Sequence, residues 1–278
     1  ISIKYNVEKG EKYKVNKITI SGNTRTRDKV IRREIKIKEQ ENYSGTKIKK
    51  SKSFINRRNY FEFVNIKEVP SKDKPNYLDL EVEVEEKPTG YFSIQGGYSS
   101  VEALLLGVQI QENNLFGYGK SLGASVTVGT VSQNFLIDYF DPYFLDTSYQ
   151  FGLQLFKREY QYIDYDRARW GGVLQFGKEL NTWTFARLKY RFESIKVDDL
   201  NSVATEVLQE SKDKISSVTL GLTYDTRDNF MDPSKGISSS LYIQESNSYL
   251  GANLHFTEYT ASFGKYYSFI PNHTLAFT

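Results

Sequence analysis

The chain has 278 residues, of which 39% are hydrophobic and 26% charged, and its formal net charge is +3. No run approaches the roughly 18 apolar residues that a transmembrane helix requires. The absence of cysteine excludes a disulfide framework and a thiolate metal site. Residues 1–88 hold 22 Lys and Arg against 14 Asp and Glu, but only 8 of the 41 aromatic residues. This division predicts two domains in different surroundings.

The first domain is expected over residues 11–88, with the element order β-α-α-β-β. Hydrophobic patterning predicts strands over residues 15–20, 63–69 and 77–85, a short helix near Asp28 and a second helix over residues 46–59. Thr24 or Thr26 is the expected N-cap of the first helix and Ser44 that of the second. Residues 1–10 alternate like the strand that closes this domain, so we interpret them as the end of a preceding copy.

The predicted helices of this domain are strongly basic. From Arg25 to Arg58 the chain has 13 Lys and Arg against 4 Asp and Glu. A solvated helical face is one interpretation, and attraction of acidic lipoproteins or anionic lipid head groups is another. Aromatic residues are not interleaved with the charges, which disfavours binding of single-stranded nucleic acid.

From Tyr91 onward the sequence alternates with a period of two residues. In the best example, Leu104, Leu106, Val108 and Ile110 fall on one face of a strand, and small or polar residues fall on the other. Repeated over many hairpins, one apolar and one polar face per strand is typical of a transmembrane β-barrel. The pattern predicts about ten strands over residues 91–99, 102–112, 120–129, 134–141, 148–157, 167–178, 182–195, 214–225, 237–244 and 253–267, and the start of an eleventh.

Several motifs resemble the BamA family of outer-membrane protein assembly factors, whose periplasmic POTRA domains precede a 16-stranded barrel. Residues 13–26 resemble the opening of a POTRA domain, and Phe63-Val64 with the strand over residues 78–86 resembles its close. Motifs similar to those of the family barrel follow in the same order at residues 115–119, 141–144, 222–228 and 233–236. The resemblance covers almost the whole chain.

The resemblance implies an α+β POTRA domain at 11–88 and the N-terminal part of an antiparallel transmembrane β-barrel at 89–278. The family's Val-Arg-Gly-(Phe/Tyr) loop motif and the strand that closes its barrel do not occur in this sequence. We therefore expect the chain to be a fragment with ten or eleven of sixteen strands. The implied location is the bacterial outer membrane with POTRA in the periplasm, and an organelle outer membrane remains an alternative.

The implied function is insertion of β-barrel proteins into the outer membrane, without enzymatic activity. The implied clients are unfolded outer-membrane proteins, and the implied partners are accessory lipoproteins or periplasmic chaperones. Membrane lipid would surround the barrel. Neither a cofactor nor nucleic acid is expected. A two-partner secretion translocator or a translocation and assembly module protein is the first alternative. A passive porin is a lesser one, because a porin does not need the β-α-α-β-β domain.

The first barrel strand is the expected client-binding site. In the family this strand forms the weak side of a lateral gate, where a client strand adds to unpaired backbone groups. Glycine leaves such a strand short of packing side chains; tight curvature is the alternative reason for glycine there. The expected gate residues are Tyr91, Phe92, Ser93, Ile94, Gln95, Gly96, Gly97 and Tyr98.

A second client-binding edge is expected in the POTRA domain, where relatives bind partner or client strands by the same mechanism. It comprises Phe63, Val64, Asn65, Ile66 and Lys67. A plain edge strand, blunted by Lys67 and Pro70, is the alternative.

Four charged residues are expected on the lumenal face of the barrel. Arg187, Lys189 and Arg191 alternate with apolar residues, and cations facing lipid near the midplane would cost roughly 2–4 kcal/mol each. Asp225 or Asp138, or the absent loop, is the expected pairing partner. No combination of nucleophile, base and orienting group is recognisable, and His255 and His273 lack ligand spacing. We expect neither a catalytic nor a metal site.

Overall fold

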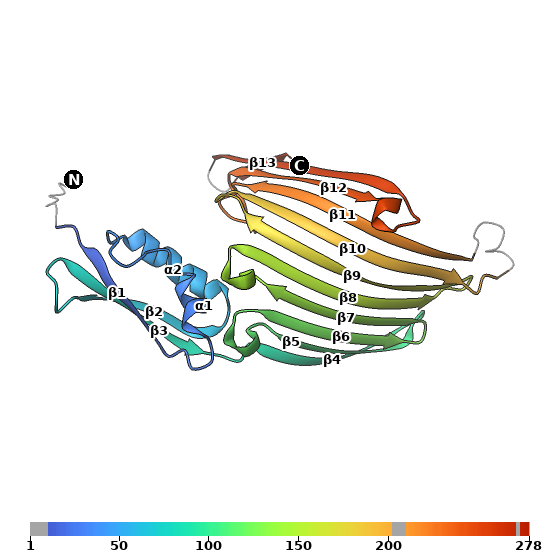
Figure 1. Cartoon of the computed structure of the whole chain (residues 1–278), viewed down its shortest axis with the longest axis horizontal. Coiled ribbons are helices and arrows are strands. Elements are labelled where there is room, and N and C mark those ends of the chain that lie inside the picture. The colour runs from blue at the N-terminus through green and yellow to red at the C-terminus, as the bar shows by residue number, and fades with distance from the viewer. Residues whose placement is uncertain (1–10, 202–209, 271–272, 278) are drawn as a thin grey trace. The chain divides into compact units, whose positions relative to one another are not determined.

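The computed structural model of the chain describes residues 11–201, 210–270 and 273–277 (Figure 1). The strand expected over residues 1–10 lies outside these ranges. Two compact units are present. One contains the residues up to Tyr91 together with Glu112–Gly119, and the other contains Phe92–Gln111 and the residues from Lys120 onward. Each is described separately below.

The first unit is built on a three-stranded sheet with the order β1-β3-β2. The central strand β3 (Tyr77–Glu86) pairs parallel with β1 (Lys14–Ser21) and antiparallel with β2 (Phe61–Pro70). Two helices, α1 (Asp28–Arg32) and α2 (Gly45–Arg57), connect β1 to β2. No described helix is long and apolar enough to cross a membrane.

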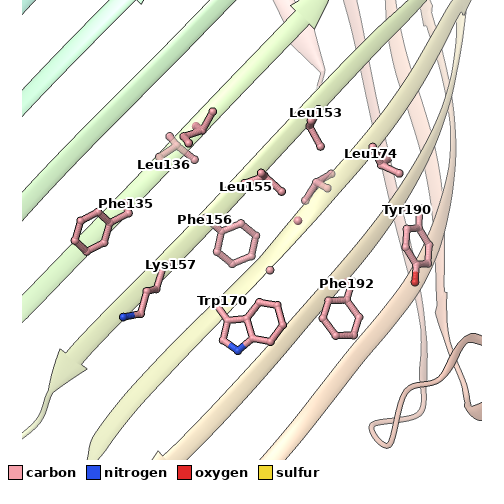
Figure 2. Close-up of a pocket in the computed structure, with 14 residues that line it drawn as sticks. Phe135, Leu136, Leu153, Leu155, Phe156, Lys157, Trp170, Leu174, Tyr190 and Phe192 are labelled. Carbon is pink, nitrogen blue, oxygen red and sulfur yellow. The ribbon is translucent and has the colours of Figure 1, made fainter.

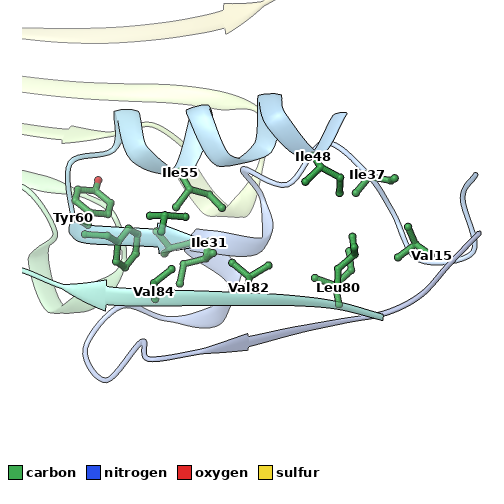
Figure 3. Packing of buried hydrophobic residues seen from close by; sticks show 13 residues of the cluster. Val15, Ile31, Ile37, Ile48, Ile55, Tyr60, Leu80, Val82 and Val84 are labelled. Carbon is green, nitrogen blue, oxygen red and sulfur yellow. The ribbon is translucent and has the colours of Figure 1, made fainter. Parts of the chain in front are cut away.

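Helix–sheet packing forms the hydrophobic core of this unit (Figure 3). Ile48, Ser51 and Ile55 recur at the three- or four-residue spacing of one helix face, and all three are buried. Leu80, Val82 and Val84 present the alternate positions of β3 to that face. The core therefore forms because a helical and a strand periodicity expose matching apolar surfaces.

One of the predicted helix caps is confirmed and the other is wrong. Ser44 caps α2, because its Oγ accepts a hydrogen bond from the Lys47 N–H at 3.4 Å. Helix α1 instead has Arg27 at its N-cap position, without a side-chain cap. The hydroxyls of Thr24 and Thr26 are used elsewhere: Thr24 donates to Glu86, and Thr26 accepts from Asn114.

The second unit is built on one antiparallel sheet of eleven strands, in which each strand neighbours the next along the chain. This confirms the predicted fold class and strand number. The strands are β4 (Gly90–Ser99), β5 (Ala103–Glu112), β6 (Ser121–Gly129), β7 (Ser132–Asp141), β8 (Tyr149–Gln161), β9 (Asp166–Glu179), β10 (Thr184–Asp198), β11 (Ser211–Asp225), β12 (Gly236–Ser246), β13 (Phe256–Ile270) and β14 (His273–Phe277). The sheet is not closed, so β4 and β14 are its two edges. Short 3-10 helices lie at Leu115–Gly117, Phe144–Asp146 and Ser248–Leu250.

Several strands run past the ends that the alternation predicts, and β8 and β10 show this clearly. Strand β8 continues to Gln161 and β10 to Asp198, past the expected ends at Lys157 and Ile195. In these extensions the backbone pairing continues, but charged residues such as Glu159 and Lys196 occupy the positions that are apolar earlier in the strand. The alternation of apolar and polar residues therefore ends before the backbone hydrogen bonding between the strands ends.

The register assigns every strand one apolar and one polar face. Because residues opposite each other in an antiparallel pair share a face, Ile137, Leu155 and Gly172 lie on one side of the sheet. Asp138, Gln154 and its partner Val173 lie on the other. On the apolar side Leu104, Ile137 and Leu155 are 56%, 49% and 47% exposed, which is the surface that a barrel turns toward lipid.

Candidate functional site: strand edges, lumenal charges and a turn clasp

Strand β4 forms one edge of the large sheet, with β5 as its one neighbour among the described strands. Its side chains are open to the surroundings: Phe92, Ile94 and Tyr98 are 61%, 71% and 83% exposed. Among the described strands no strand other than β5 pairs with β4. The residues predicted for the lateral gate, Tyr91–Tyr98, all lie in β4.

Packing does not require Gly96 and Gly97, the two adjacent glycines inside β4. A Cβ atom on Gly97 would meet no atom within 4 Å, and one on Gly96 would meet only Leu106 Cδ2, at 3.8 Å. Neither residue has a positive φ. Crowding therefore does not explain their presence. Client binding at this edge stays a prediction.

Strand β2 is an edge of the small sheet. Val64 is buried in the core, Phe63 is 52% exposed, and Lys67 forms an ion pair with Glu83 of β3 at 2.6 Å. All five residues of the predicted POTRA edge, Phe63–Lys67, therefore lie on a strand with one unpaired side. Binding of partner or client strands there also stays a prediction.

The three predicted lumenal cations share the polar face of β10. Arg187, Lys189 and Arg191 alternate with Leu188 and Tyr190, which face the apolar side. The carboxylate that pairs with Arg191 is Glu193, which sequence reasoning missed. Glu193 is 1% exposed, forms an ion pair with Arg191 and lies 3.2 Å from Arg169 Nε of β9.

Asp225 is not the partner of this basic row, so that expectation is wrong. Its carboxylate accepts hydrogen bonds from Arg227 Nε at 3.0 Å and Nη2 at 2.6 Å. The short sequence separation explains the pairing, because a turn brings residues two positions apart together at little cost in entropy. Glu193 pairs with Arg191 for a similar reason, because the two residues are two positions apart on the same face of one strand.

A turn clasp joins two distant segments of the first unit: Thr26 and Arg27 before α1, and Asn114, Gly117 and Gly119 between β5 and β6. Asn114 Nδ2 donates to Thr26 Oγ1 at 2.8 Å, and its Oδ1 accepts from the Gly119 N–H at 2.8 Å. The Arg27 N–H donates to the Gly117 carbonyl at 3.0 Å. The sequence identifies residues 115–119 as a motif, but it does not predict that this turn contacts Thr26 and Arg27.

Gly117 is required by this geometry. Its φ is +74°, and a Cβ atom would lie 2.0 Å from the carbonyl oxygen of Arg25. A side chain is therefore excluded both by the backbone conformation and by the close approach. Over the following Tyr118 ring lies the Arg27 guanidinium, 3.9 Å from the ring centroid.

Glu86, at the end of β3, fixes the Thr24–Thr26 loop for the clasp. Its carboxylate accepts hydrogen bonds from the Thr24 hydroxyl at 2.7 Å, the Arg25 N–H at 2.8 Å and the Thr26 N–H at 2.5 Å. Burial raises the pKa of Glu86, but the hydrogen bonds from Thr26, Thr24 and Arg25 outweigh it and lower the pKa to about 2. Glu86 is therefore a charged anchor near neutral pH.

Within the described ranges, no three His, Asp or Glu side chains cluster as metal ligands would.

Two family models match the chain. One, described as the Omp85 superfamily domain, matches residues 114–278, and the POTRA model, described as a surface antigen variable number repeat, matches residues 13–87. The outer membrane protein assembly factor BamA of Nitratidesulfovibrio vulgaris is 28% identical over 278 residues. That alignment covers 99% of this chain and 35% of the relative, so the chain spans about a third of the relative's length.

Two solved structures share the fold. BamA from Haemophilus ducreyi lacking POTRA domains 1–3 has a TM-score of 0.71 and 21% identity, with 96% of this chain and 54% of that chain covered. CdiB from Acinetobacter baumannii has a TM-score of 0.60 and 14% identity, with 92% and 49% covered. At these identities the likeness shows the fold alone.

Proposed function

Because the chain belongs to the Omp85 superfamily, we propose that its protein is an insertase that folds other β-barrel proteins into the outer membrane. The chain is a BamA-type fragment, and outer-membrane localisation follows from its assembly-factor relatives. The coarse function, insertase or translocator, is common to the family. Insertion in particular, and the absence of enzymatic chemistry, are the proposal.

The observation that carries the proposal is the loose packing of Gly96 and Gly97 in β4, the first strand of the large sheet. A client strand adds to the unpaired backbone of Phe92–Tyr98 by β-augmentation. Each added hydrogen bond satisfies a backbone group that hydrocarbon cannot satisfy, and the client's apolar face enters lipid. Strand pairing and burial thus supply the free energy, without a nucleotide.

The POTRA domain receives clients before they reach β4. Its location in the periplasm places the exposed edge β2 where unfolded outer-membrane proteins arrive. The basic residues between Arg25 and Arg58 attract acidic lipoproteins or chaperones. Lys67 and Pro70 limit unspecific pairing at this edge.

Crosslinking of the full-length protein tests the gate. Cysteines at Gln95 and in the closing barrel strand are expected to form a disulfide that blocks insertion, with recovery on reduction. Cysteines at Thr127 and Asn134, which lie opposite each other on β6 and β7, are the matched control and leave insertion unchanged. A fully crosslinked gate variant that still inserts clients would refute the proposal.

A related translocator is the second candidate, supported by the shared fold with CdiB. Depletion of the full-length protein in its host separates the two functions. An insertase is expected to lower the levels of many outer-membrane barrels. Loss of a single secreted protein, with unchanged barrels, would establish the translocator instead.

A further inference from the structure

The apolar face of the sheet contains a groove of about 730 Å³ that spans β7 to β10 (Figure 2). Ile137, Leu155, Leu174 and Tyr190 line it, and all four lie on the apolar face. Lys157 and Trp170 lie toward one end of the groove, and Leu153 and Leu174 toward the other. An elongated apolar chain fits this shape.

The groove exists because Gly172 interrupts a continuous row of large side chains. Gly172 lies between Leu155 of β8 and Phe192 of β10 on the apolar face. A Cβ atom on it would meet Leu155 Cδ2 at 3.0 Å, so even a small side chain would enter the groove. Trp170 packs edge-to-face on Phe192, with ring centroids 5.7 Å apart, and forms one wall.

Lysines lie on the same face beyond the Trp170 end of the groove. Lys157 lies opposite Trp170, Trp170 lies opposite Ser194, and Ser194 lies opposite Lys214. Three strand spacings separate Lys157 from Lys214, which is about 14 Å. Lys212 and Lys196 lie opposite each other one step further along the strands. Lys157 and Lys196 form ion pairs with Glu159 and Asp198.

Connectivity assigns this end of the groove to the outer leaflet. The POTRA domain precedes β4, so a periplasmic POTRA makes even-numbered strands begin at the periplasmic end. Strand β8 therefore reaches Lys157 near its outer end, and β11 begins at its outer end with Lys212 and Lys214. Trp170 lies at the same level, where tryptophan is enriched at membrane interfaces.

We propose that this surface is a binding site for an outer-leaflet glycolipid whose head group carries two phosphates, as in lipid A. One acyl chain lies in the groove over Gly172. One phosphate contacts Lys157, which exchanges its ion pair with Glu159 for the phosphate, and the other contacts Lys214 with Lys212. Two separated cationic points fit two phosphates better than the single phosphate of a phospholipid. The site goes beyond insertion and rests only on the periplasmic location of POTRA.

Native mass spectrometry of the delipidated full-length protein in detergent tests the site, with hexa-acylated lipid A, phosphatidylglycerol and phosphatidylcholine as probes. Lipid A is expected to bind at least tenfold more tightly than phosphatidylcholine. Replacing Lys157 and Lys214 together by Gln is expected to weaken lipid A binding about 30-fold and to leave phosphatidylcholine unchanged. Gly172→Leu is expected to weaken binding of lipid A by filling the groove.

Ala261→Leu and Lys265→Gln are the controls, because both residues lie on the apolar face of β13 away from the groove. Heat-modifiable gel migration checks that each variant is folded, and the double lysine variant decides the test if Gly172→Leu does not fold. Equal binding of lipid A and phosphatidylcholine, or unchanged lipid A binding in the lysine variant, would overturn the site. Phosphatidylglycerol binding as tightly as lipid A would overturn recognition of two phosphates.

Discussion

Asn114 donates a hydrogen bond to Thr26 at 2.8 Å although 88 residues of sequence separate them. Both side chains are buried, with 7% and 3% of their surface exposed. The same amide accepts from the Gly119 N–H, so one side chain holds the loop before α1 and shapes the turn between β5 and β6. This turn follows the β4–β5 hairpin, which contains the proposed gate strand. Asn114 therefore joins two segments of the first unit that are far apart in the sequence.

Asn114→Ala is expected to destabilise the clasp by about 1–3 kcal/mol, because the change leaves buried hydrogen-bonding groups without partners. Hydrogen exchange of the full-length protein measures it: exchange should accelerate in residues 112–119 and in the Thr24–Thr26 loop. Asn181→Ala is the matched control, because the Asn181 side chain also shapes a turn, where it accepts hydrogen bonds from the backbone N–H groups of Trp183 and Thr184. Unchanged exchange at residues 112–119 in Asn114→Ala would contradict the clasp.

Gly117→Ala is expected to be far more damaging than Gly97→Ala. The first change places a Cβ 2.0 Å from the Arg25 carbonyl oxygen at a φ of +74°, and the second places one in open space. We expect a loss of at least about 2 kcal/mol for Gly117→Ala. Thermal unfolding of purified full-length variants measures the difference, and equal melting temperatures would show that the turn adjusts without cost.

The alternation of side chains was sufficient to predict the strands, because in a barrel one period-two pattern sets both the register and the two faces. The strand that contains Leu104 and Ile110 shows this, because its alternation identifies both the strand and its exposed apolar side. The sequence motifs predicted the protein family, and the two family models confirm that prediction.

Pairings between distant residues could not be predicted from local pattern. Glu193 lies in an unremarkable alternating strand, and its burial depends on Arg169 of the neighbouring strand. A threonine before a helix is a common N-cap, and this predicts Thr26 as a cap of α1. In the structure the Thr26 hydroxyl instead accepts a hydrogen bond from the Asn114 side chain. In each case a long-range partner decided between two locally acceptable arrangements.

Stability of the first unit is expected to depend on pH through Glu86. Its pKa of about 2 lies below the ordinary value of 4.5, so the folded state holds the charged form more tightly than the unfolded state does. The contribution of Glu86 is fully present above pH 4.5 and is lost as the pH falls through 4.5 toward 2. Hydrogen exchange of the Thr24–Thr26 loop at pH 7, 4 and 2.5, corrected for intrinsic rates, measures this loss.

Glu86→Gln is expected to remove most of that pH dependence and to cost about 1.5–3 kcal/mol at pH 7, because the hydrogen bonds lose their charged acceptor. Glu62→Gln is the control, since Glu62 is exposed at the start of the neighbouring strand β2. A Glu86→Gln protein that kept the wild-type pH profile would assign the acid sensitivity to other carboxyl groups.

Glu193→Gln is expected to be the most destabilising single change on the polar face of the sheet. Glu193 is 1% exposed between Arg169 and Arg191, and its neutralisation leaves two cations without their carboxylate. Breaking a buried pair in this way costs about 3–5 kcal/mol. Glu159→Gln breaks the exposed pair with Lys157 and should cost less than about 1 kcal/mol. The temperature at which the full-length barrel loses its folded gel mobility measures both changes. If both variants lost their folded gel mobility at the same temperature, Glu193 would not be required, and other groups would neutralise Arg169 and Arg191.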